Sequence, residues 1–305
     1  MSTTTNTIAI LFITLIIIFF GGVYSFNIID SFTDFTTKTI TLSNPSIKNP
    51  VTQTFRTAYN GQHYIINMDF DPRIHSTISQ SESTLIIYSI SGIDTQHIQQ
   101  YMTHPSNTHL NPLITALKSI SSNPQTQAKL AIRLVKNIPY DKNKQDSIKK
   151  GHIETVRYPY STLYDNLGIC SDQSYLLGYL LKELGFKTYY LGYSKPTPHV
   201  NIGIATTPQY SYKQTPYIII EPTGTKFVFN SDYGYPSEIT SPDPPFSVLI
   251  SNGISLTDIS KEYRADNRLL EIQSQNNIIS AFMELPEYLD YYISYGLPNP
   301  TNSKS

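Results

Sequence analysis

A single cysteine, Cys170, is the feature that most constrains how this chain can fold. One thiol can form neither an intramolecular disulfide nor a cysteine-rich zinc site, so neither kind of cross-link supports the fold. Stability must come from a packed core, and a hydrophobic fraction of 39% in 305 residues can build one large domain or two modest ones. An unpaired cysteine in an exported protein can oxidise, which makes a chemical role attractive; burial as a small hydrophobic residue is the alternative.

The first segment predicts a membrane anchor. Residues 8–20 are almost purely apolar, and Thr7–Phe26 has the length of a bilayer core. We therefore predict an uncleaved single-pass helix within residues 1–26, with the soluble part outside the cell at the cell membrane. A signal peptide cleaved near Ser25, which would release a secreted protein, is the alternative.

Composition shifts along the soluble part predict four further regions. The expected order is a stalk or linker rich in Thr, Ser, Asn and Pro, an N-terminal subdomain, a core and a C-terminal helix with its tail: 27–53, 54–123, 124–250 and 251–305.

Capping signals and hydrophobic periodicity predict the elements of the core. Asn-Pro pairs open helices at Asn111 and Asn123, and residues 142–157 are expected to form a polar surface loop. A helix opens at Cys170 and ends near Leu184, with Gly185 as its C-cap. The remaining predictions are strands at 64–70, 188–192, 199–205 and 217–221 and a helix at 256–273.

Charge gives little indication of a binding partner. The formal net charge is −1, and Lys and Arg are scattered, so we expect no nucleic-acid partner. We expect no cofactor and no metal: Asp69, Asp71 and Asp243 lack the spacing of a calcium loop, and the pair His152 and Glu154 has no third ligand.

The position of Cys170 suits a nucleophile. A helix N-terminus carries about +0.5 of a charge, which favours thiolate over thiol. Gly168 allows a tight turn before it, and the Cys170 amide can donate to a developing oxyanion. The helix start thus supplies both an activated sulfur and half of an oxyanion hole.

His199 and Glu221 could complete a catalytic site. If strands 199–205 and 217–221 form a hairpin centred near Tyr210, His199 lies directly opposite Glu221. A carboxylate there would hold the imidazole in the tautomer that accepts a proton from the thiol. Taken singly, His199 could be a structural histidine, and Glu221 could be a turn residue before a proline.

Several short motifs resemble those of transglutaminase-like domains. Pro159–Leu163 and Gly168–Ser174 resemble the P-x-x-T-L and G-x-C-x-D-x-S signature of that superfamily. Pro198–Val200 resembles its histidine motif, and Tyr217–Thr223 resembles its acid motif. The resemblance covers about residues 55–250 and looks closest to membrane-anchored archaeal members.

This resemblance implies an α+β fold of the papain-like, transglutaminase-like type, in which the nucleophile helix packs on an antiparallel sheet. It implies Cys170 as nucleophile, His199 as base and Glu221 as orienting acid, although Asp is more common than Glu at the third position. Residues 124–250 would form the catalytic core.

Two other positions bear on the resemblance. Ile169 stands where many members carry a polar or acidic residue. No obvious Gln or Trp completes the oxyanion hole; Tyr164 and Asn166 are open candidates.

The resulting functional hypothesis is a cell-surface thiol hydrolase, similar to a cysteine peptidase or amidase. Its substrate would be a peptide or protein, for example a cell-wall or surface peptide, cleaved at an amide or isopeptide bond. One alternative is a transglutaminase that passes the acyl group to an amine and cross-links proteins. The other is a non-catalytic surface binding module on the same fold.

Overall fold

The computed structural model describes residues 36–82, 95–152, 155–193, 199–223 and 245–274, and side chains of the last segment as far as residue 267. Contacts divide the chain into Met1–Thr36 and Thr37–Ser305, and the elements below all belong to the second unit. The predicted anchor lies outside the described residues. Within the described segments, no helix combines the length and the hydropathy needed to cross a bilayer.

Seven strands and ten helical segments make up the described part of the second unit. The strands are β1 (Thr37–Leu42), β2 (Val51–Tyr59), β3 (Gln62–Phe70), β4 (Thr188–Tyr193), β5 (His199–Ala205), β6 (Tyr217–Ile220) and β7 (Phe246–Ser251). The α-helices are α3 (Pro72–Ser79), α4 (Thr95–Thr103), α5 (Asn111–Ile120), α6 (Pro124–Lys136), α7 (Lys142–Lys149), α8 (Pro159–Asp165), α9 (Cys170–Glu183) and α10 (Ser260–Ser274). Two short 3-10 helices complete the set, η2 (Pro105–Leu110) and η3 (Pro208–Tyr210).

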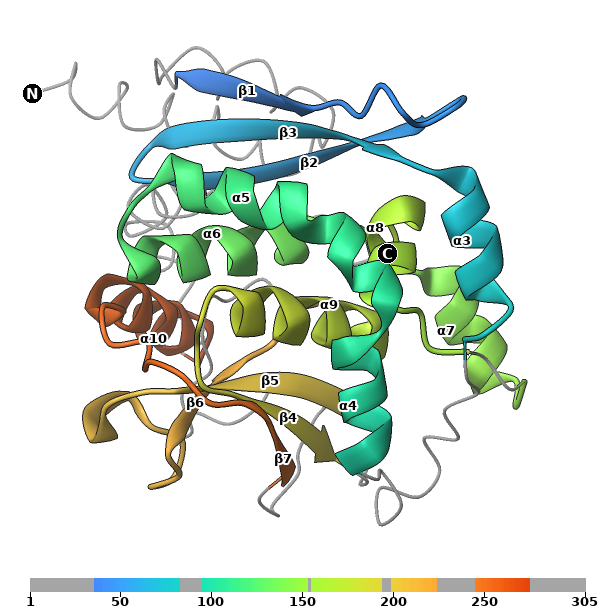
Figure 1. The fold of residues 1–305 in the computed structure, drawn as a ribbon. Coiled ribbons are helices and arrows are strands. Elements are labelled where there is room, and N and C mark those ends of the chain that lie inside the picture. The colour runs from blue at the N-terminus through green and yellow to red at the C-terminus, as the bar shows by residue number, and fades with distance from the viewer. Residues whose placement is uncertain (1–35, 83–94, 153–154, 194–198, 224–244, 275–305) are drawn as a thin grey trace, which may run out of the picture. The chain divides into compact units, whose positions relative to one another are not determined.

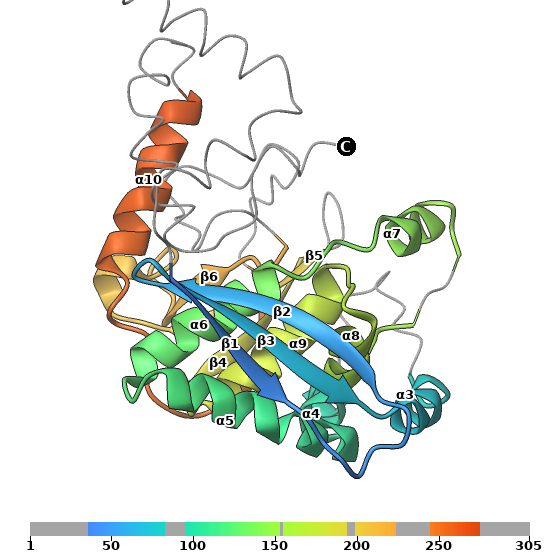
Figure 2. The same cartoon turned by 90° about the horizontal axis from the view of Figure 1, so that it is seen from above.

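Two sheets enclose a layer of helices (Figure 1). One sheet has the order β1-β3-β2 and the other the order β6-β5-β4-β7. Helix α6 contacts β2 on one side and α9 on the other, and α9 in turn packs on β5 and β4. Figure 2 shows the first sheet crossing over α5 and α6. Helix α9, which begins at Cys170, therefore lies within the helical layer, between α6 and the β6-β5-β4-β7 sheet.

The central position of α9 explains its composition. Leu176, Leu177, Leu180 and Leu181 are fully buried, each contributing about 1.5–3 kcal/mol of transfer free energy. Gly178 lies where the helix approaches the second sheet most closely, because a Cβ there would come within 2.9 Å of the Ile250 side chain. The expectation of a nucleophile helix on an antiparallel sheet is confirmed, since every pairing in the β6-β5-β4-β7 sheet is antiparallel.

Several expectations need correction. Residues 142–157 are not simply a surface loop: Asp141 caps the polar helix α7 by accepting from the Lys144 amide at 2.9 Å. Thr37–Leu42, which belongs to the predicted stalk or linker, is a strand rich in β-branched residues and pairs with β3 in parallel. Asn111 is not a cap, since α5 already begins there after Leu110. The predictions at Asn123 and Gly185 are confirmed, by a cap bond to the Gln125 amide and by a φ of +86° respectively.

Candidate active site

Helix α9 presents Cys170 as its first residue. The N-cap residue, Ile169, has no side-chain acceptor; instead, Asp172 in the first turn accepts a hydrogen bond from the Ile169 amide at 3.1 Å. Cys170 is partly buried at this helix start. Gly168 is needed for close packing rather than for a left-handed turn, because a Cβ there would lie 3.0 Å from the Asp172 Cβ.

A buried ionic network surrounds the carboxylate of Asp172. This Asp172 network comprises Asp141, Lys144, Arg157, Asp165 and Asp172. Lys144 Nζ lies 2.8 and 2.9 Å from the two Asp172 oxygens, and the Arg157 guanidinium lies 3.1 Å from one of them. Arg157 also binds Asp141 at 2.9 Å and Asp165 at 2.7 Å. Burial alone would lower the pKa of Arg157, but these three carboxylates raise it above its ordinary value.

Tyr140 lies near Cys170, although no sequence motif marked it as part of the site. Its backbone pairs with Gly168, two residues before Cys170. Burial raises the pKa of the Tyr140 hydroxyl strongly, and the nearby charges of Cys170 and Glu221 raise it further. Tyr140 thus interacts electrostatically with both Cys170 and Glu221. The sequence contained no indication of this beyond the position of Tyr140 after a helix.

His199 is the first residue of β5, and Glu221 follows the last residue of β6. The expected register is wrong by two residues, because Ile202 pairs with Ile220 rather than with Ile218. The loop contains η3 and a tight turn in which Lys213 and Gln214 have positive φ, so the hairpin is not centred at Tyr210. A shift of two residues keeps a side chain on the same sheet face, so Glu221 approaches His199 diagonally.

The side chains of His199 and Glu221 are hydrogen-bonded through His199 Nε2 and Glu221 Oε2. Thr223, which follows in the turn, holds the other carboxylate oxygen with its amide at 3.1 Å and its hydroxyl at 2.5 Å. Burial alone would raise the pKa of Glu221, but the charge of His199 and these hydrogen bonds hold it below its usual range. Glu221 is therefore ionised and oriented.

The charge of Cys170 acts on the same imidazole. Because Nε2 is bound to Glu221, Nδ1 is the nitrogen that remains for the sulfur. Burial alone would lower the pKa of His199, but the charges of Glu221 and Cys170 and the hydrogen bond to Glu221 raise it well above its usual value. The structure thus brings all three predicted site residues together. Ser174 on α9 strengthens this arrangement by donating to the Val200 carbonyl at 3.3 Å.

Lys136 is a second residue that the sequence did not single out. It ends α6, is buried, and donates from Nζ to the backbone carbonyl of Glu221. Burial lowers its pKa to about 8, and Glu221 and Asp266 counteract part of that effect. The hydrophobic periodicity of α6 gave no sign of a buried cation at its end.

The printed contacts of the two oxyanion candidates do not involve Cys170. Tyr164 stacks on His75 with ring centroids 3.9 Å apart, and Asn166 ends α8 in the left-handed conformation. The Cys170 amide remains the donor expected from the sequence. Helix geometry at the first residue leaves such an amide without an intrahelical acceptor.

Metal sites were not expected, and the acidic residues that raised the question have other partners. Asp69 accepts from Thr52 at 2.7 Å, and Asp71 caps α3. His152 lies 3.2 Å from the Ser147 hydroxyl, while Glu154 and Asp243 lie outside the described residues. Across the described segments, no cluster of three His, Cys, Asp or Glu side chains has a geometry suited to a metal ion.

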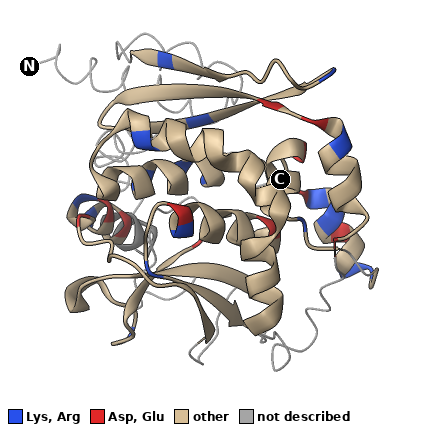
Figure 3. Cartoon of the chain, in the orientation of Figure 1, with Lys and Arg blue, Asp and Glu red and all other residues tan. Residues whose placement is uncertain are grey.

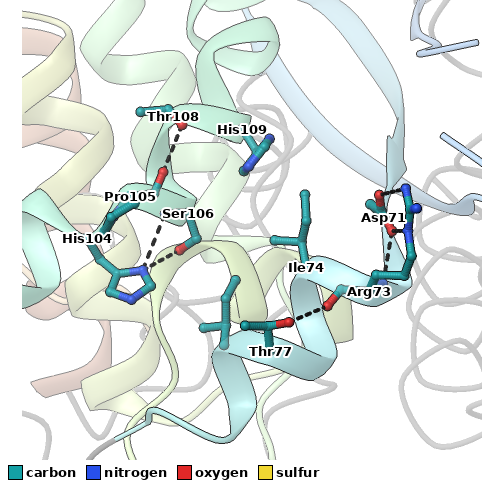
Figure 4. A pocket seen from close by; sticks show the side chains of 10 residues that line it. Asp71, Arg73, Ile74, Thr77, His104, Pro105, Ser106, Thr108 and His109 are labelled. Atoms are coloured by element: carbon teal, nitrogen blue, oxygen red, sulfur yellow. Dashed lines mark hydrogen bonds and ion pairs between the residues drawn. The ribbon is translucent and has the colours of Figure 1, made fainter. Parts of the chain in front are cut away.

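A hollow of about 630 Å³ lies between α3 and η2 (Figure 4). None of the three predicted site residues lines it. Its polar groups pair with one another: Arg73 contacts Asp71 at 2.6 Å, and His104 Nδ1 lies 2.7 Å from the Ser106 hydroxyl. The hollow is therefore separate from the chemistry proposed for Cys170.

Comparison with known proteins agrees with the resemblance over part of the chain. Residues 109–219 match the family described as "Transglutaminase-like domain". No curated protein sequence matches this chain significantly.

Two solved structures show weak similarity. One is a TGase crystal structure, with 14% identity and a TM-score of 0.29, covering 56% of this chain and 44% of that one, so the chain spans under half of that protein. The other is calcium-bound LapG of Legionella pneumophila, with 18% identity and a TM-score of 0.31, covering 58% of this chain and 99% of that one. The family match includes Cys170 and His199 and ends two residues before Glu221, so the segment that carries these two residues is similar to a transglutaminase-like domain.

Proposed function

We propose that this chain is a thiol hydrolase that cleaves an amide or isopeptide bond with Cys170 as nucleophile, His199 as base and Glu221 as orienting acid. One observation carries the proposal: the imidazole of His199 is hydrogen-bonded to Glu221 through Nε2, and the charge of Cys170 acts on the same ring. This is the arrangement of base, nucleophile and orienting group that activated nucleophiles require.

The raised pKa of His199 means that the imidazole is protonated at neutral pH. The proposed reaction starts from the thiolate of Cys170, because the thiolate is the nucleophilic form of cysteine. The thiolate attacks the carbonyl carbon, and a C–S bond forms while the negative charge moves to oxygen. The Cys170 amide at the start of α9 donates to that oxygen. Collapse of the intermediate breaks the C–N bond, and His199 gives its proton to the leaving amine.

Water then completes the reaction. Neutral His199 accepts a proton from the attacking water, a C–O bond forms, and the C–S bond of the thioester breaks. The products are an amine and a carboxylic acid, and the thiolate–imidazolium pair is restored. Glu221 stays ionised throughout and stabilises the protonated ring.

The proposed substrate is a peptide or protein at the cell surface. The apolar segment Thr7–Phe26 supports this location, because it has the length of a membrane anchor. A tethered catalyst acts on what lies near the membrane, such as a surface or wall peptide.

The first experiment is labelling of Cys170 in the full chain, kept in mild detergent, with a thiol-reactive acyl-mimic probe across pH. We expect fast labelling at pH 6 in the wild type and its loss in His199→Ala. The matched control is His152→Ala, which removes an exposed histidine and should label like the wild type. Labelling at the rate of an ordinary thiol, indifferent to His199, would leave a non-catalytic binding module.

A competition experiment separates hydrolysis from acyl transfer. The thioester formed from a peptide substrate is offered water alone or water with a primary amine. A free acid in both mixtures supports the hydrolase, whereas an amide product whenever the amine is present supports the cross-linking alternative.

A further inference from the structure

Three buried cationic residues share one face of α6. Lys129, Arg133 and Lys136 follow one another at spacings of four and three residues, which places them in a row along a helix. All three are buried, with Arg133 fully so. Burying an ionised side chain is costly unless a partner of opposite charge is buried with it, so the row needs a matching acidic surface.

Helix α10 and the segment before it supply that surface. Lys129 lies 3.3 Å from Asp258 and 3.0 Å from Glu262, and Arg133 lies 3.2 Å from Glu262. Asp266, one turn further along α10 and also buried, acts on Lys136 electrostatically. Figure 3 shows the acidic and basic positions of α10 beside the basic positions of α6. These six residues, Lys129, Arg133, Lys136, Asp258, Glu262 and Asp266, form the α6–α10 charge strip.

Lys136 differs from the other two cations of the strip. Arg133 donates to the backbone carbonyl of Ala58 at 2.7 Å. Ala58 lies on β2, which belongs to the other sheet and not to the one that carries His199. Lys136 reaches the backbone carbonyl of Glu221, the residue whose side chain holds His199. The end of the strip nearest Lys136 therefore contacts the backbone of the candidate acid.

We propose that Lys136 is a positioning residue for the active site: its ammonium fixes the backbone at the end of β6 so that the Glu221 carboxylate meets His199, with Asp266 of α10 as its counter-charge. The catalytic consequence rests on the proposed function, whereas the structural link does not.

The physical reason lies in how Glu221 is held. Glu221 follows the last paired residue of β6, so no ladder hydrogen bond of the sheet fixes its own carbonyl in place. A hydrogen bond from an ammonium group is stronger than one between neutral groups, and leaving the carbonyl without it would strand a buried acceptor. A small displacement of a catalytic carboxylate is enough to weaken its hold on a base.

The direction in which the pKa of His199 changes when Lys136 is replaced separates a positioning role from a simple charge effect. The groups that face His199 in the described structure are Glu221, Cys170 and the Tyr193 ring, 6.3 Å away. A lysine acting only through its positive charge would depress the pKa of His199, so its removal would raise that pKa. Loss of Glu221 from its position removes a raising influence and lowers the pKa of His199.

The test is an NMR titration of His199 in the full chain in detergent, with the signal assigned by its absence in His199→Ala. We expect Lys136→Met to lower the pKa of His199 by about one unit or more toward its unperturbed value near 6.5. Lys136→Arg keeps the charge and a donor and should retain most of the wild-type value. The matched control is Lys129→Met, equally buried on the same face, which should leave the titration of His199 unchanged.

The outcomes are distinct. A rise or no change in the pKa of His199 in a folded Lys136→Met variant overturns the proposal, as does an equal fall in Lys129→Met. Slow labelling of wild-type Cys170 would count against the proposed enzyme, but the titration would still decide whether Lys136 positions Glu221.

A second variant covers the case in which Lys136→Met fails to fold. Asp266→Asn preserves shape and removes the counter-charge, and Asp258→Asn at the exposed end of the strip is its control. We expect the pKa of His199 to fall in Asp266→Asn and to stay at the wild-type value in Asp258→Asn. An unchanged titration in Asp266→Asn would remove α10 from the proposal.

Discussion

Two buried ionic networks support the candidate site, and they are built in different ways. The Asp172 network lies behind Cys170 and joins residues that are at most 31 positions apart, from Asp141 to Asp172. The α6–α10 charge strip lies behind Glu221 and joins side chains about 129 positions apart in sequence. In the Asp172 network, two cations, Lys144 and Arg157, bind one carboxylate. In the α6–α10 charge strip, cations of α6 pair with acids of α10 and of the segment before it.

The difference separates a local support from a distant one. The Asp172 network fixes the start of α9 with side chains that lie nearby in the sequence. They include the Arg157 guanidinium, which stays charged at every accessible pH. The charge strip depends on the docking of α10 and ends in a lysine that loses its proton near pH 8. The start of α9 is thus supported at every accessible pH, while the support of Glu221 depends on pH and on a separate helix.

The largest effect should come from Asp172→Asn. This change leaves Lys144 and the Arg157 guanidinium in a buried region without their shared carboxylate, at a cost of about 3–5 kcal/mol in the free energy of unfolding. Urea denaturation followed by circular dichroism measures it. A loss below about 1 kcal/mol would mean that Asp141 and Asp165 alone can compensate the two cations.

Glu262→Gln should have a smaller effect on stability, because Lys129 keeps Asp258 and one cation rather than two loses its carboxylate. The buried Arg133 keeps only the Ala58 carbonyl, so we expect a loss of about 3 kcal/mol, the low end of the range for breaking a buried ion pair. The same denaturation experiment applies, with near-wild-type labelling of Cys170 at pH 7 as a second readout. A cost equal to that of Asp172→Asn would remove the distinction between the two networks.

The pH dependence of stability should distinguish Lys136 from Arg157. Lys136 titrates near pH 8 when folded and near 10.5 when unfolded, so the unfolded chain binds more protons between these values. Stability of the wild type relative to Lys136→Met should therefore rise from about pH 8 to pH 10. For Arg157→Met the difference should stay constant over that range, because the pKa of Arg157 is raised. Parallel curves for both variants would contradict the assigned titration.

The smallest effect is expected for Asp258→Ala. Its side chain is 56% exposed, so its pairing with Lys129 is screened by water and contributes about 0–1 kcal/mol. Thermal unfolding of this variant beside Glu262→Gln would show whether the strip becomes stronger toward its buried end. A larger loss in Asp258→Ala would reverse that gradient.

The sequence predicted elements whose signals are local. The N-cap at Asn123, the C-terminal glycine after α9 and the strand that begins at His199 all follow from residues within a few positions. The convergence of Cys170, His199 and Glu221 also appeared in advance, from chain order and family motifs. The hairpin register did not, because it depends on positive φ angles at Lys213 and Gln214, which no residue type there requires.

Contacts between distant segments were not predictable in the same way. Hydrophobic periodicity marked one buried face of α6, but Lys129 and Lys136 are buried on another face. That burial is possible only because α10 brings acids to it, and a pattern within α6 contains no information about α10. The polar helix α7 was missed for a similar reason, since Lys144 is buried by its contact with Asp172 rather than by apolar spacing.

The dependence of Lys136 on α10 has a consequence for the order in which the protein is made. Synthesis proceeds from the N-terminus, so Glu221 leaves the ribosome 45 residues before Asp266, a delay of roughly 2–9 s at ~5–20 residues per second. During that interval the nascent chain contains the cysteine, the histidine and the acid, but not the helix whose charge supports the acid. On the proposed arrangement, the support of Glu221 is complete only after α10 has been translated.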